Sequence, residues 1–392
     1  MRSFIEKVIE YCARNKFIVF ILATAAVLAG VLALKSLPLD ALPDLSDTQV
    51  IIYSRWDRSP DILEDQVTYP IVTALLGAPK VKAIRGFSDF GYSYVYVIFQ
   101  DGTDIYWARS RVLEYLSKIT SRLPEGVRTE LGPDATGVGW VFQYALVDET
   151  GQNSLADLRT FQDWYLRYYL QSVPGVAEVA TVGGFLRQYQ VNIDPNKLLI
   201  YNIPITEVAE AIRKGNNDVG GRLLEFSGTE YMVRGRGYAK SVKDLEEIVV
   251  GVDAKSGIPI LVKNIASVSL GPDIRRGVAE LDGKGDCVGG IVVMRHGESA
   301  LAVIKRVKEK LKEIEPALPA GVKIVTAYDR TELINKSIDT ISEVLIEDFL
   351  IVGAMIIFFL LHIPSAMMPI ILLPAGALIA FIPMLGMRLT VN

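Results

Sequence analysis

Two long uncharged stretches near the ends of the chain constrain its fold more than any other feature. One runs from Phe17 to Leu34, and the other from Phe349 to Met387, where His362 is the only ionisable residue. The residues between these stretches have the mixed polarity of globular protein. The pattern predicts a chain that crosses a lipid bilayer, builds a large domain on the far side and returns.

Helix length sets the number of crossings. A helix rises about 1.5 Å per residue and the hydrocarbon core is about 30 Å thick, so the 18 residues of the first stretch span it once. The 39 residues of the second stretch would reach about 58 Å and must fold back as two helices. The predicted turn is His362-Ile363-Pro364-Ser365, because proline breaks a helix. We therefore predict three transmembrane helices, within residues 1–36, 338–362 and 366–387.

The charges on either side of the first span predict its orientation. The cations Arg2, Lys7, Arg14 and Lys16 precede it, whereas the anions Asp40, Asp44 and Asp47 follow it. By the positive-inside rule the N-terminus is cytoplasmic and the middle of the chain is extracytoplasmic. A cleaved signal peptide is the alternative, but the apolar stretch exceeds a normal signal core and residues 35–38 form a poor cleavage site. We favour a retained anchor.

Composition and spacing exclude several classes of function. The net charge is −4 and the sequence has no cluster of Lys and Arg, which argues against a nucleic-acid partner. Cys12 and Cys287 fall on opposite sides of the membrane in this topology, so no disulfide is expected. The sequence contains no phosphate-binding Gly-Lys-Ser/Thr loop and no spacing typical of a catalytic triad. We therefore expect neither an enzyme nor a cofactor.

A repeat at an offset of 195 residues organises the soluble part of the chain. Residues 97–102 (VIFQDG) align with 292–297 (VVMRHG), and LPEGV at 123–127 aligns with LPAGV at 318–322. Each copy has the pattern of a strand, an amphipathic helix, a Leu-Pro-x-Gly turn and a second strand. The helix of each copy is therefore expected to lie with one face on a sheet.

A weaker echo, at an offset of 95 residues, aligns residues 79–81 with 174–176. Together the two echoes predict two α+β sandwiches and an excursion between their parts. The predicted ranges are 45–135 for the first sandwich, 136–182 plus 275–330 for the second, and 183–274 for the excursion. The excursion includes a glycine-rich loop, Lys214–Gly221, and a segment of this kind often contacts a neighbour.

Several long runs resemble one family of membrane proteins along the whole chain. They are DALPDLSDTQVII (40–52), GFSDFGYSYVYVIFQDGTDIYWARSRVLEYL (86–116), LGPDATGVGW (131–140), EYMVR (230–234) and RRGVAELDGKG (275–285). They resemble the heavy-metal efflux branch of the resistance-nodulation-division (RND) transporters, nearest to its copper/silver exporters.

The resemblance implies a homotrimeric pump of the bacterial inner membrane that is driven by proton inflow. Such a pump exports metal cations through a periplasmic adaptor (membrane fusion) protein and an outer-membrane channel. The sandwiches would be ferredoxin-like porter subdomains in the periplasm. The excursion would be a docking subdomain whose loop reaches the adjacent protomer.

Two departures from the family pattern accompany the resemblance. Family members have a second half that repeats the first, and this sequence ends at Asn392, where the fourth span would begin. The proton-carrying acidic residues and the central methionine cluster of the family are therefore expected outside this chain. Copper/silver members typically have a methionine in a PEMRRG run, where this chain has Ile274 in PDIRRG.

Sulfur and carboxylate side chains in the predicted spans are candidates for handling cations. Monovalent copper and silver favour sulfur, so Met355, Met384 and Met387 are candidate metal ligands, unless they are simply flexible apolar filler. The carboxylates Glu343, Glu347 and Asp348 enter the second span and are candidates for a cation entrance. The alternative for these carboxylates is that charged flanks set the depth of the helix.

The remaining polar and aromatic candidates are weaker. Neither His296 nor His362 has a partner at metal-ligand spacing, so each is interpreted as a loop residue, with a pH-sensitive role as the alternative. Five aromatic residues at helical spacing are interpreted as sandwich core: Phe161, Trp164, Tyr165, Tyr168 and Tyr169. Two other functions stay open, namely export of organic compounds and a non-conducting assembly or interaction module.

Overall fold

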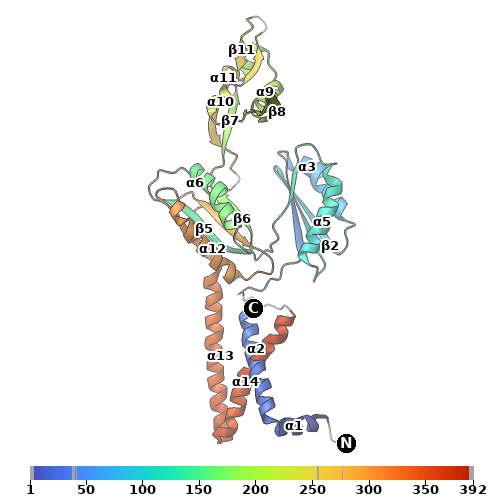
Figure 1. Cartoon of the computed structure of the whole chain (residues 1–392), viewed down its shortest axis with the longest axis vertical. Coiled ribbons are helices and arrows are strands. Elements are labelled where there is room, and N and C mark those ends of the chain that lie inside the picture. The colour runs from blue at the N-terminus through green and yellow to red at the C-terminus, as the bar shows by residue number, and fades with distance from the viewer. Residues whose placement is uncertain (1–3, 38–39, 41, 254–255, 276, 388–392) are drawn as a thin grey trace. The chain divides into compact units, whose positions relative to one another are not determined.

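The computed structural model describes residues 4–37, 40, 42–253, 256–275 and 277–387 (Figure 1). The predicted cation Arg2 lies outside these residues. The chain divides into two compact units. The first unit comprises residues 1–149, 162–182 and 289–392, and the second comprises 150–161 and 183–288. Each unit is described by itself below.

The apolar stretches of the first unit form long helices. They are α2 (Lys16–Ser36), α13 (Arg330–Leu360) and α14 (Ile363–Gly386), and the short α1 (Phe4–Arg14) precedes α2. Within the described residues, only α2 and α14 have the length and apolar composition of a membrane span. The prediction of three spans is therefore supported for two helices. The third, α13, carries Glu343, Glu347 and Asp348 inside it, which leaves only a short uncharged segment from Phe349.

The first sandwich in the first unit is a four-stranded antiparallel sheet of order β2-β3-β1-β4 with helices on one face. Its elements are β1 (Gln49–Arg55), α3 (Pro60–Leu63), the π-helical turn η1 (Glu64–Thr68), α4 (Tyr69–Leu75), β2 (Val81–Asp89), β3 (Tyr92–Phe99), α5 (Ile105–Thr120) and β4 (Arg128–Leu131). Alternate residues of β1, such as Val50 and Ile52, are buried against α5 and the α3–α4 segment.

The second sheet has the equivalent order, β6-β13-β5-β14. Its strands and helices are β5 (Trp140–Asp148), α6 (Leu155–Phe161), the π-helical turn η2 (Gln162–Leu166), α7 (Arg167–Gln171), β6 (Val176–Gly183), β13 (Val288–Met294), α12 (Ala300–Ile314), η3 (Glu315–Ala317) and β14 (Val322–Asp329). Helix α5 begins at Ile105 and α12 begins at Ala300, which is the offset of 195 residues found in the sequence. Both sheets therefore have the strand order and the connecting helices of a ferredoxin-like sandwich.

Three of the five aromatic residues that were predicted to be core are exposed, and the other two, Phe161 and Tyr165, are only partly buried. Trp164 is 69% exposed, and Tyr168 and Tyr169 are also exposed. The buried positions of this helical run are instead Leu158, Gln162, Leu166 and Leu170, four residues apart. The prediction was wrong because helical spacing alone does not say which face meets the core, and aromatic residues were assumed to mark it.

The larger segment of the second unit, residues 183–288, contains a two-stranded ribbon that encloses its other elements. Strand β7 (Arg187–Ile193) pairs antiparallel with β12 (Ala266–Pro272). The elements between them are α8 (Pro195–Tyr201), α9 (Ile205–Gly215), β8 (Val219–Phe226), β9 (Thr229–Gly235), α10 (Val242–Glu246), β10 (Val249–Val252), β11 (Pro259–Leu261) and α11 (Val262–Ile265). A small core around Val208, Val262 and Ile265 holds this unit together.

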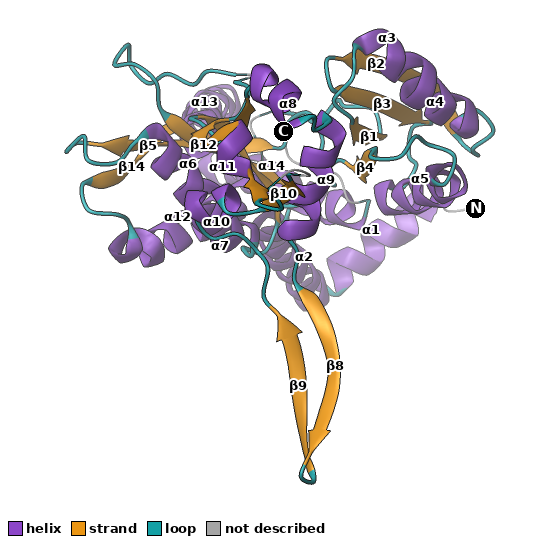
Figure 2. Ribbon diagram, turned by 90° about the horizontal axis from the view of Figure 1, so that it is seen from above, coloured by secondary structure: helices purple, strands orange, loops and turns teal. Residues whose placement is uncertain are grey.

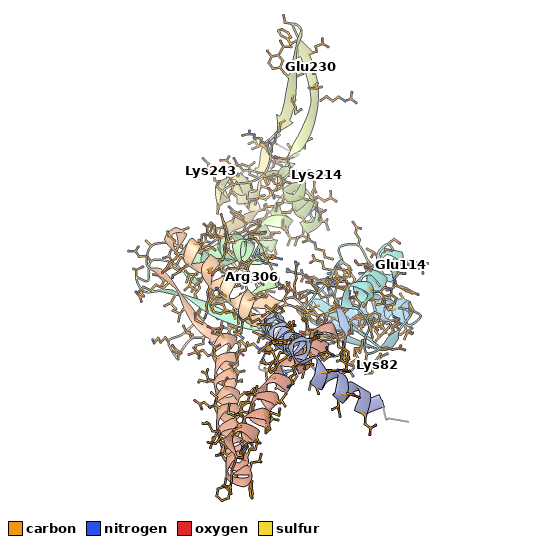
Figure 3. The ribbon with its side chains drawn as sticks, turned by 60° about the horizontal axis from the view of Figure 1, so that its bottom comes forward. Lys82, Glu114, Lys214, Glu230, Lys243 and Arg306 are labelled. Atoms are coloured by element: carbon orange, nitrogen blue, oxygen red, sulfur yellow. The ribbon has the colours of Figure 1, made fainter. Side chains whose placement is uncertain are left out.

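A long hairpin occupies the place where the sequence predicted a glycine-rich loop. Strands β8 and β9 pair antiparallel, and Figure 2 shows them extending well away from the rest of their unit. All residues of both strands are exposed, including Glu230, which is labelled in Figure 3. The predicted loop, Lys214–Gly221, is confirmed only for residues 216–218, because α9 continues to Gly215 and β8 begins at Val219. The last glycine of the run serves close strand approach: a Cβ on Gly221 would lie 2.5 Å from the Val233 carbonyl oxygen.

Candidate functional site

Helices α2 and α14 pack with their backbones in close contact. A Cβ on Gly30 of α2 would lie 2.3 Å from the Leu378 carbonyl oxygen of α14, a distance that no side chain tolerates. Ala33, one turn further along α2, is also buried. Small residues at such a crossing are what allow two helices to pack tightly in a membrane, where burial of apolar surface from water contributes nothing.

Helix α13 turns back into α14 at the residues that the sequence predicted. Leu361 adopts a left-handed conformation (φ 48°), and His362 precedes the first turn of α14, which contains Pro364. The His362 Nδ1 atom lies 2.8 Å from the Ser365 Oγ atom, so the imidazole is hydrogen-bonded within the turn. His362 is thus part of the turn, and it belongs to no group of three or more His, Cys, Asp or Glu that could hold a metal ion among the described residues.

The two antiparallel helices can be aligned residue by residue. A cavity of about 240 Å³ lies between them, lined by Phe349, Gly353 and Ile356 from α13 and by Ile370, Leu373 and Pro374 from α14. A Cβ on Gly353 would lie 3.8 Å from Ile370 Cδ1. Gly353 is therefore level with Ile370, and each step back along α13 corresponds to one step forward along α14.

This alignment locates the predicted entrance carboxylates. Counting one residue for one from Gly353 and Ile370 pairs Asp348 with Ala375 and Glu343 with Ala380. Ala375 lies about 18 Å along α14 from its first residue, well inside a helix that is apolar throughout. The side chains of Glu343, Glu347 and Asp348 are all exposed on the surface of the described chain. The three carboxylates thus lie alongside the span α14 and not beyond its end.

The same alignment separates the candidate methionine ligands. Met355 is level with Met368, near the turn, whereas Met384 lies near the far end of α14. Met355 and Met384 are therefore about 24 Å apart along the helices, and one ion held by short metal–sulfur bonds cannot reach both. Met387 follows α14 and is exposed.

A polar connector, residues 132–139, joins the two sandwiches and bonds to the link that follows α2. The Thr136 hydroxyl donates to the Asp44 carboxylate (2.6 Å), and the Ser46 backbone N–H donates to its other oxygen (3.0 Å). Burial would raise the pKa of Asp44, but these hydrogen bonds and the nearby His296 hold it below its ordinary value. His296 thus lies beside an anion, although no metal-binding group of three His, Cys, Asp or Glu occurs among the described residues.

The connector also bonds to both sandwiches. The Tyr106 hydroxyl of α5 donates to Asp134 (3.1 Å), and Arg295, just after β13, forms an ion pair with the same carboxylate (3.6 Å). The His296 backbone N–H donates to the Asp134 carbonyl oxygen (2.9 Å). Asp134 therefore links a helix of the first sandwich to a strand end of the second.

Arg330, which the sequence reasoning did not single out, is the first residue of α13 and is only 1% exposed. Its Nε atom lies 3.1 Å from Asp40 Oδ1, in the link after α2, and its Nη1 atom donates to the Val138 carbonyl oxygen in the connector. No sequence pattern marks such a residue, because its two contacts come from segments that are far apart from it in the chain.

Ile274, in place of the methionine expected from the family motif, is 73% exposed. The neighbouring Arg275 forms an ion pair with Asp286 (2.8 Å), and this hydrogen bond lowers the pKa of Asp286 below its ordinary value of 3.8. Cys287 is buried, and desolvation raises the pKa of its thiol, so it resembles a structural cysteine more than a thiolate ligand.

The sequence matches known efflux proteins over almost its entire length. It is 49% identical over 389 residues to the "cation efflux system protein CusA" of Escherichia coli K12, covering 99% of this chain and 37% of that protein. It is 48% identical over 389 residues to the "putative cation efflux system protein SilA" of Salmonella typhimurium, with the same coverage. Identity to the "cobalt-zinc-cadmium resistance protein CzcA" of Cupriavidus metallidurans is 36% over 395 residues, again 99% of this chain and 37% of that protein.

The fold leads to the same group of proteins. The crystal structure of a heavy metal efflux pump superposes on 98% of this chain and 38% of its own, with a TM-score of 0.87 and 29% sequence identity. The sequence model of the AcrB/AcrD/AcrF family matches residues 8–392. The chain spans little more than a third of the length of the curated relatives that it matches. It therefore belongs to the AcrB/AcrD/AcrF family of RND transporters, not to an enzyme family, and corresponds to the N-terminal part of a heavy-metal efflux pump.

Proposed function

We propose that this chain is the N-terminal portion of an inner-membrane pump that exports monovalent copper or silver and is driven by protons. The observation that carries the proposal is the difference in identity between relatives. The chain is 49% identical to CusA but only 36% identical to a cobalt-zinc-cadmium resistance protein over the same region. A soft monovalent cation is handled by sulfur ligands, and the last two helices are rich in methionine.

A chimaera tests the choice of metal. The aligned part of E. coli CusA is replaced by this chain in a strain without its own copy, and growth is measured on silver, copper, zinc, cobalt and cadmium. We expect restored growth on silver and copper only. Growth restored on zinc, cobalt or cadmium, or on organic toxins alone, would contradict the proposal. Unmodified CusA in the same strain is the control.

We propose three membrane spans, with α13 as the second. The pairing of α13 with α14 supports this, because a helix packed along a span lies at the same depth. The N-terminus and the His362 turn are then cytoplasmic, and both sandwiches are periplasmic. The test attaches a membrane-impermeant maleimide to Ser227→Cys and to Ser365→Cys, in a Cys12→Ser/Cys287→Ser background. Labelling of intact cells at residue 365 but not at 227 would overturn the topology.

We propose that Glu343, Glu347 and Asp348 form a cation entrance along α13. Their level beside α14 supports this, since carboxylates at membrane depth are costly unless they serve transport. In the chimaera, Asp348→Asn should reduce silver resistance more than Glu343→Gln, because Glu343 lies nearer the periplasmic end. Equal resistance in both variants and the parent would argue for a role in setting helix depth. Met355, Met384 and Met387 are proposed as separate ligand positions along the path.

We propose that the pump is a homotrimer whose second unit docks against neighbouring subunits, a periplasmic adaptor and an outer-membrane channel. The β8–β9 hairpin supports this, because a two-stranded ribbon exposed on both faces is marginal alone in water. Its apolar side chains include Leu224, Phe226 and Met232. A Leu224→Ser/Phe226→Ser variant should lower the trimer fraction measured by native mass spectrometry. The matched control is Leu199→Ser, on exposed α8.

A further inference from the structure

Among the fully buried side chains in the described part of the chain, Arg330 is the largest by volume, and it is charged. Taking a guanidinium out of water costs several kcal/mol, and an ion pair recovers this only when its geometry is good and its other donors are bonded. Arg330 does not meet that condition, because its Nε and Nη2 atoms are both buried without a hydrogen bond among the described residues, and Nε faces Asp40 at 3.1 Å as an ion pair only. A methionine or leucine would fill the same buried space without the cost of desolvating a charge, so packing does not explain why this residue is an arginine.

The three segments that meet at Arg330 suggest that explanation. Asp40 belongs to the link between α2 and β1, and Val138 belongs to the connector between the two sandwiches. Arg330 itself is the first residue of α13, directly after β14. One side chain therefore holds the periplasmic ends of two membrane helices and the joint between the sandwiches. The guanidinium is suited to this, because its rigid fork of donors can bind two acceptors from different segments at once.

The contacts of Asp329, the residue before α13, fix the position of the Arg330 backbone. Asp329 caps the helix by accepting a hydrogen bond from the Thr331 N–H (2.9 Å), and Lys308 of α12 forms an ion pair with Asp329. The start of α13 is thus tied to the second sandwich before Arg330 makes any contact. When α13 is displaced, the Arg330 backbone moves with it. The Arg330 side chain then transmits this displacement to Asp40 and Val138.

We propose that Arg330 is a coupling residue: it transmits displacement of the membrane helices to the connector, so that both sandwiches move together. Without its side chain, each segment follows a membrane displacement separately. The inference rests on the membrane spans proposed above and is independent of the proposed metal.

A double-variant experiment measures the coupling directly. The whole chain is placed in nanodiscs of phosphatidylethanolamine and phosphatidylglycerol, and hydrogen exchange is followed by mass spectrometry. Gly30→Ala acts as a wedge at the membrane end, because its Cβ would meet the Leu378 backbone. In the otherwise native chain, the wedge should change exchange in residues 132–139 by about fivefold. In the Arg330→Met background, the same wedge should leave exchange in residues 132–139 unchanged.

Two further variants separate coupling from general loosening. Arg295→Met also removes a contact to the connector, at Asp134, but it comes from the end of β13 and is half-exposed, so the effect of the wedge should persist. Asp40→Asn keeps the size of its side chain and removes the ion pair, and it should weaken the effect of the wedge even where Arg330→Met fails to fold. An undiminished wedge effect in both Arg330→Met and Asp40→Asn overturns the proposal. A wedge without effect in the native background overturns it as well.

Discussion

The two sandwiches are copies of one design that differ in how their second and third strands are joined. In the first copy, β2 and β3 form a hairpin closed by Gly91 (φ 77°). In the second copy, the equivalent strands β6 and β13 are separated by the residues from Gly184 to Cys287. A hairpin turn is a natural place for a large insertion, because the flanking strands remain paired and the core is unaffected. The chain carries most of its second unit at this position.

The copies also differ in how much of their central strands is buried. Residues of β1 alternate between buried and partly exposed, as in a sheet with one face on a core. In the second copy, the equivalent strand β5 is buried on both faces around Tyr144, and β13 is buried at six of its seven positions, against five of eight in its equivalent β3. The second sheet is therefore the more constrained of the two, and equivalent substitutions should cost more there. The predictions below test this difference.

The largest difference is expected where the weak echo aligns Lys80 with Gly175. Both residues have positive φ angles, 61° and 89°. A Cβ at residue 175 would lie 2.7 Å from Val303 Cγ2 and 2.9 Å from Glu298 Oε2. We expect Gly175→Lys to destabilise the second sheet by about 2–4 kcal/mol, from backbone strain and overpacking. The measurement is the opening free energy of β6 and β13 from native-state hydrogen exchange.

The reverse substitution is the matched control in the first copy. Lys80→Gly removes the strain of a left-handed lysine, worth about 1 kcal/mol. It also removes the cation–π contact of the ammonium with Trp107 (4.8 Å), worth about 0.5–1 kcal/mol. These contributions oppose each other, so β2 and β3 should keep their protection. Equal losses in the two copies would show that neither sheet is the more constrained.

The second prediction concerns the polar groups buried in each core. In the second copy, the Tyr144 hydroxyl donates to Gln162 Oε1 (2.9 Å), and Gln162 Nε2 has no partner among the described residues. Tyr144→Phe should cost about 1–3 kcal/mol, because it leaves the Gln162 carbonyl oxygen buried and unpaired as well. The double variant Tyr144→Phe/Gln162→Met should lose less stability than Tyr144→Phe alone, because it leaves no buried amide unpaired. The measurement is the hydrogen-exchange protection of β5 in both variants.

The first copy offers the comparison for that result. The Thr68 hydroxyl lies 2.7 Å from both Ser88 Oγ and Ser93 Oγ. Ser88 is partly exposed, so water can replace Thr68 there, whereas Ser93 is only 1% exposed. Thr68→Val should therefore cost about 1 kcal/mol, the lower limit for leaving one buried hydroxyl unpaired. A larger cost for Thr68→Val than for Tyr144→Phe would contradict the ranking of the copies.

The third prediction uses pH. Burial, together with the hydrogen bond to Glu130, raises the pKa of Tyr53 from 10.0 to about 12. Because the folded-state pKa is the higher one, the stabilisation from neutral Tyr53 is complete below pH 10 and is lost as pH rises toward 12. An ultraviolet absorbance titration should find one fewer tyrosine ionising near pH 12 in Tyr53→Phe. An unchanged titration curve would place the late-ionising group elsewhere.

The sequence was sufficient for features that depend on local pattern. The 195-residue offset located equivalent helices to the residue, and Pro364 located the turn between α13 and α14. The sequence was insufficient where residue spacing does not say which face of an element meets the core. Trp164, Tyr168 and Tyr169 are exposed, and the glycines at 220 and 221 lie in a strand. Arg330 was missed because its importance arises from contacts between distant segments. Local periodicity carries no information about such contacts.

The smallest effect is expected at the equivalent surface arginines Arg111 and Arg306, which lie 195 residues apart on α5 and α12. Arg111 forms an ion pair with Glu114 (2.6 Å), and Arg306 forms one with Glu298 (3.3 Å), and Figure 3 labels Glu114 and Arg306 on their helices. Solvent screens both pairs, so replacing either arginine by methionine should change the local opening free energy by less than about 0.5 kcal/mol. The difference between the copies should therefore vanish here. A cost above 1 kcal/mol at Arg306 alone, in exchange of α12, would mean that the constraint on the second copy extends from its buried strands to its outer helix surface.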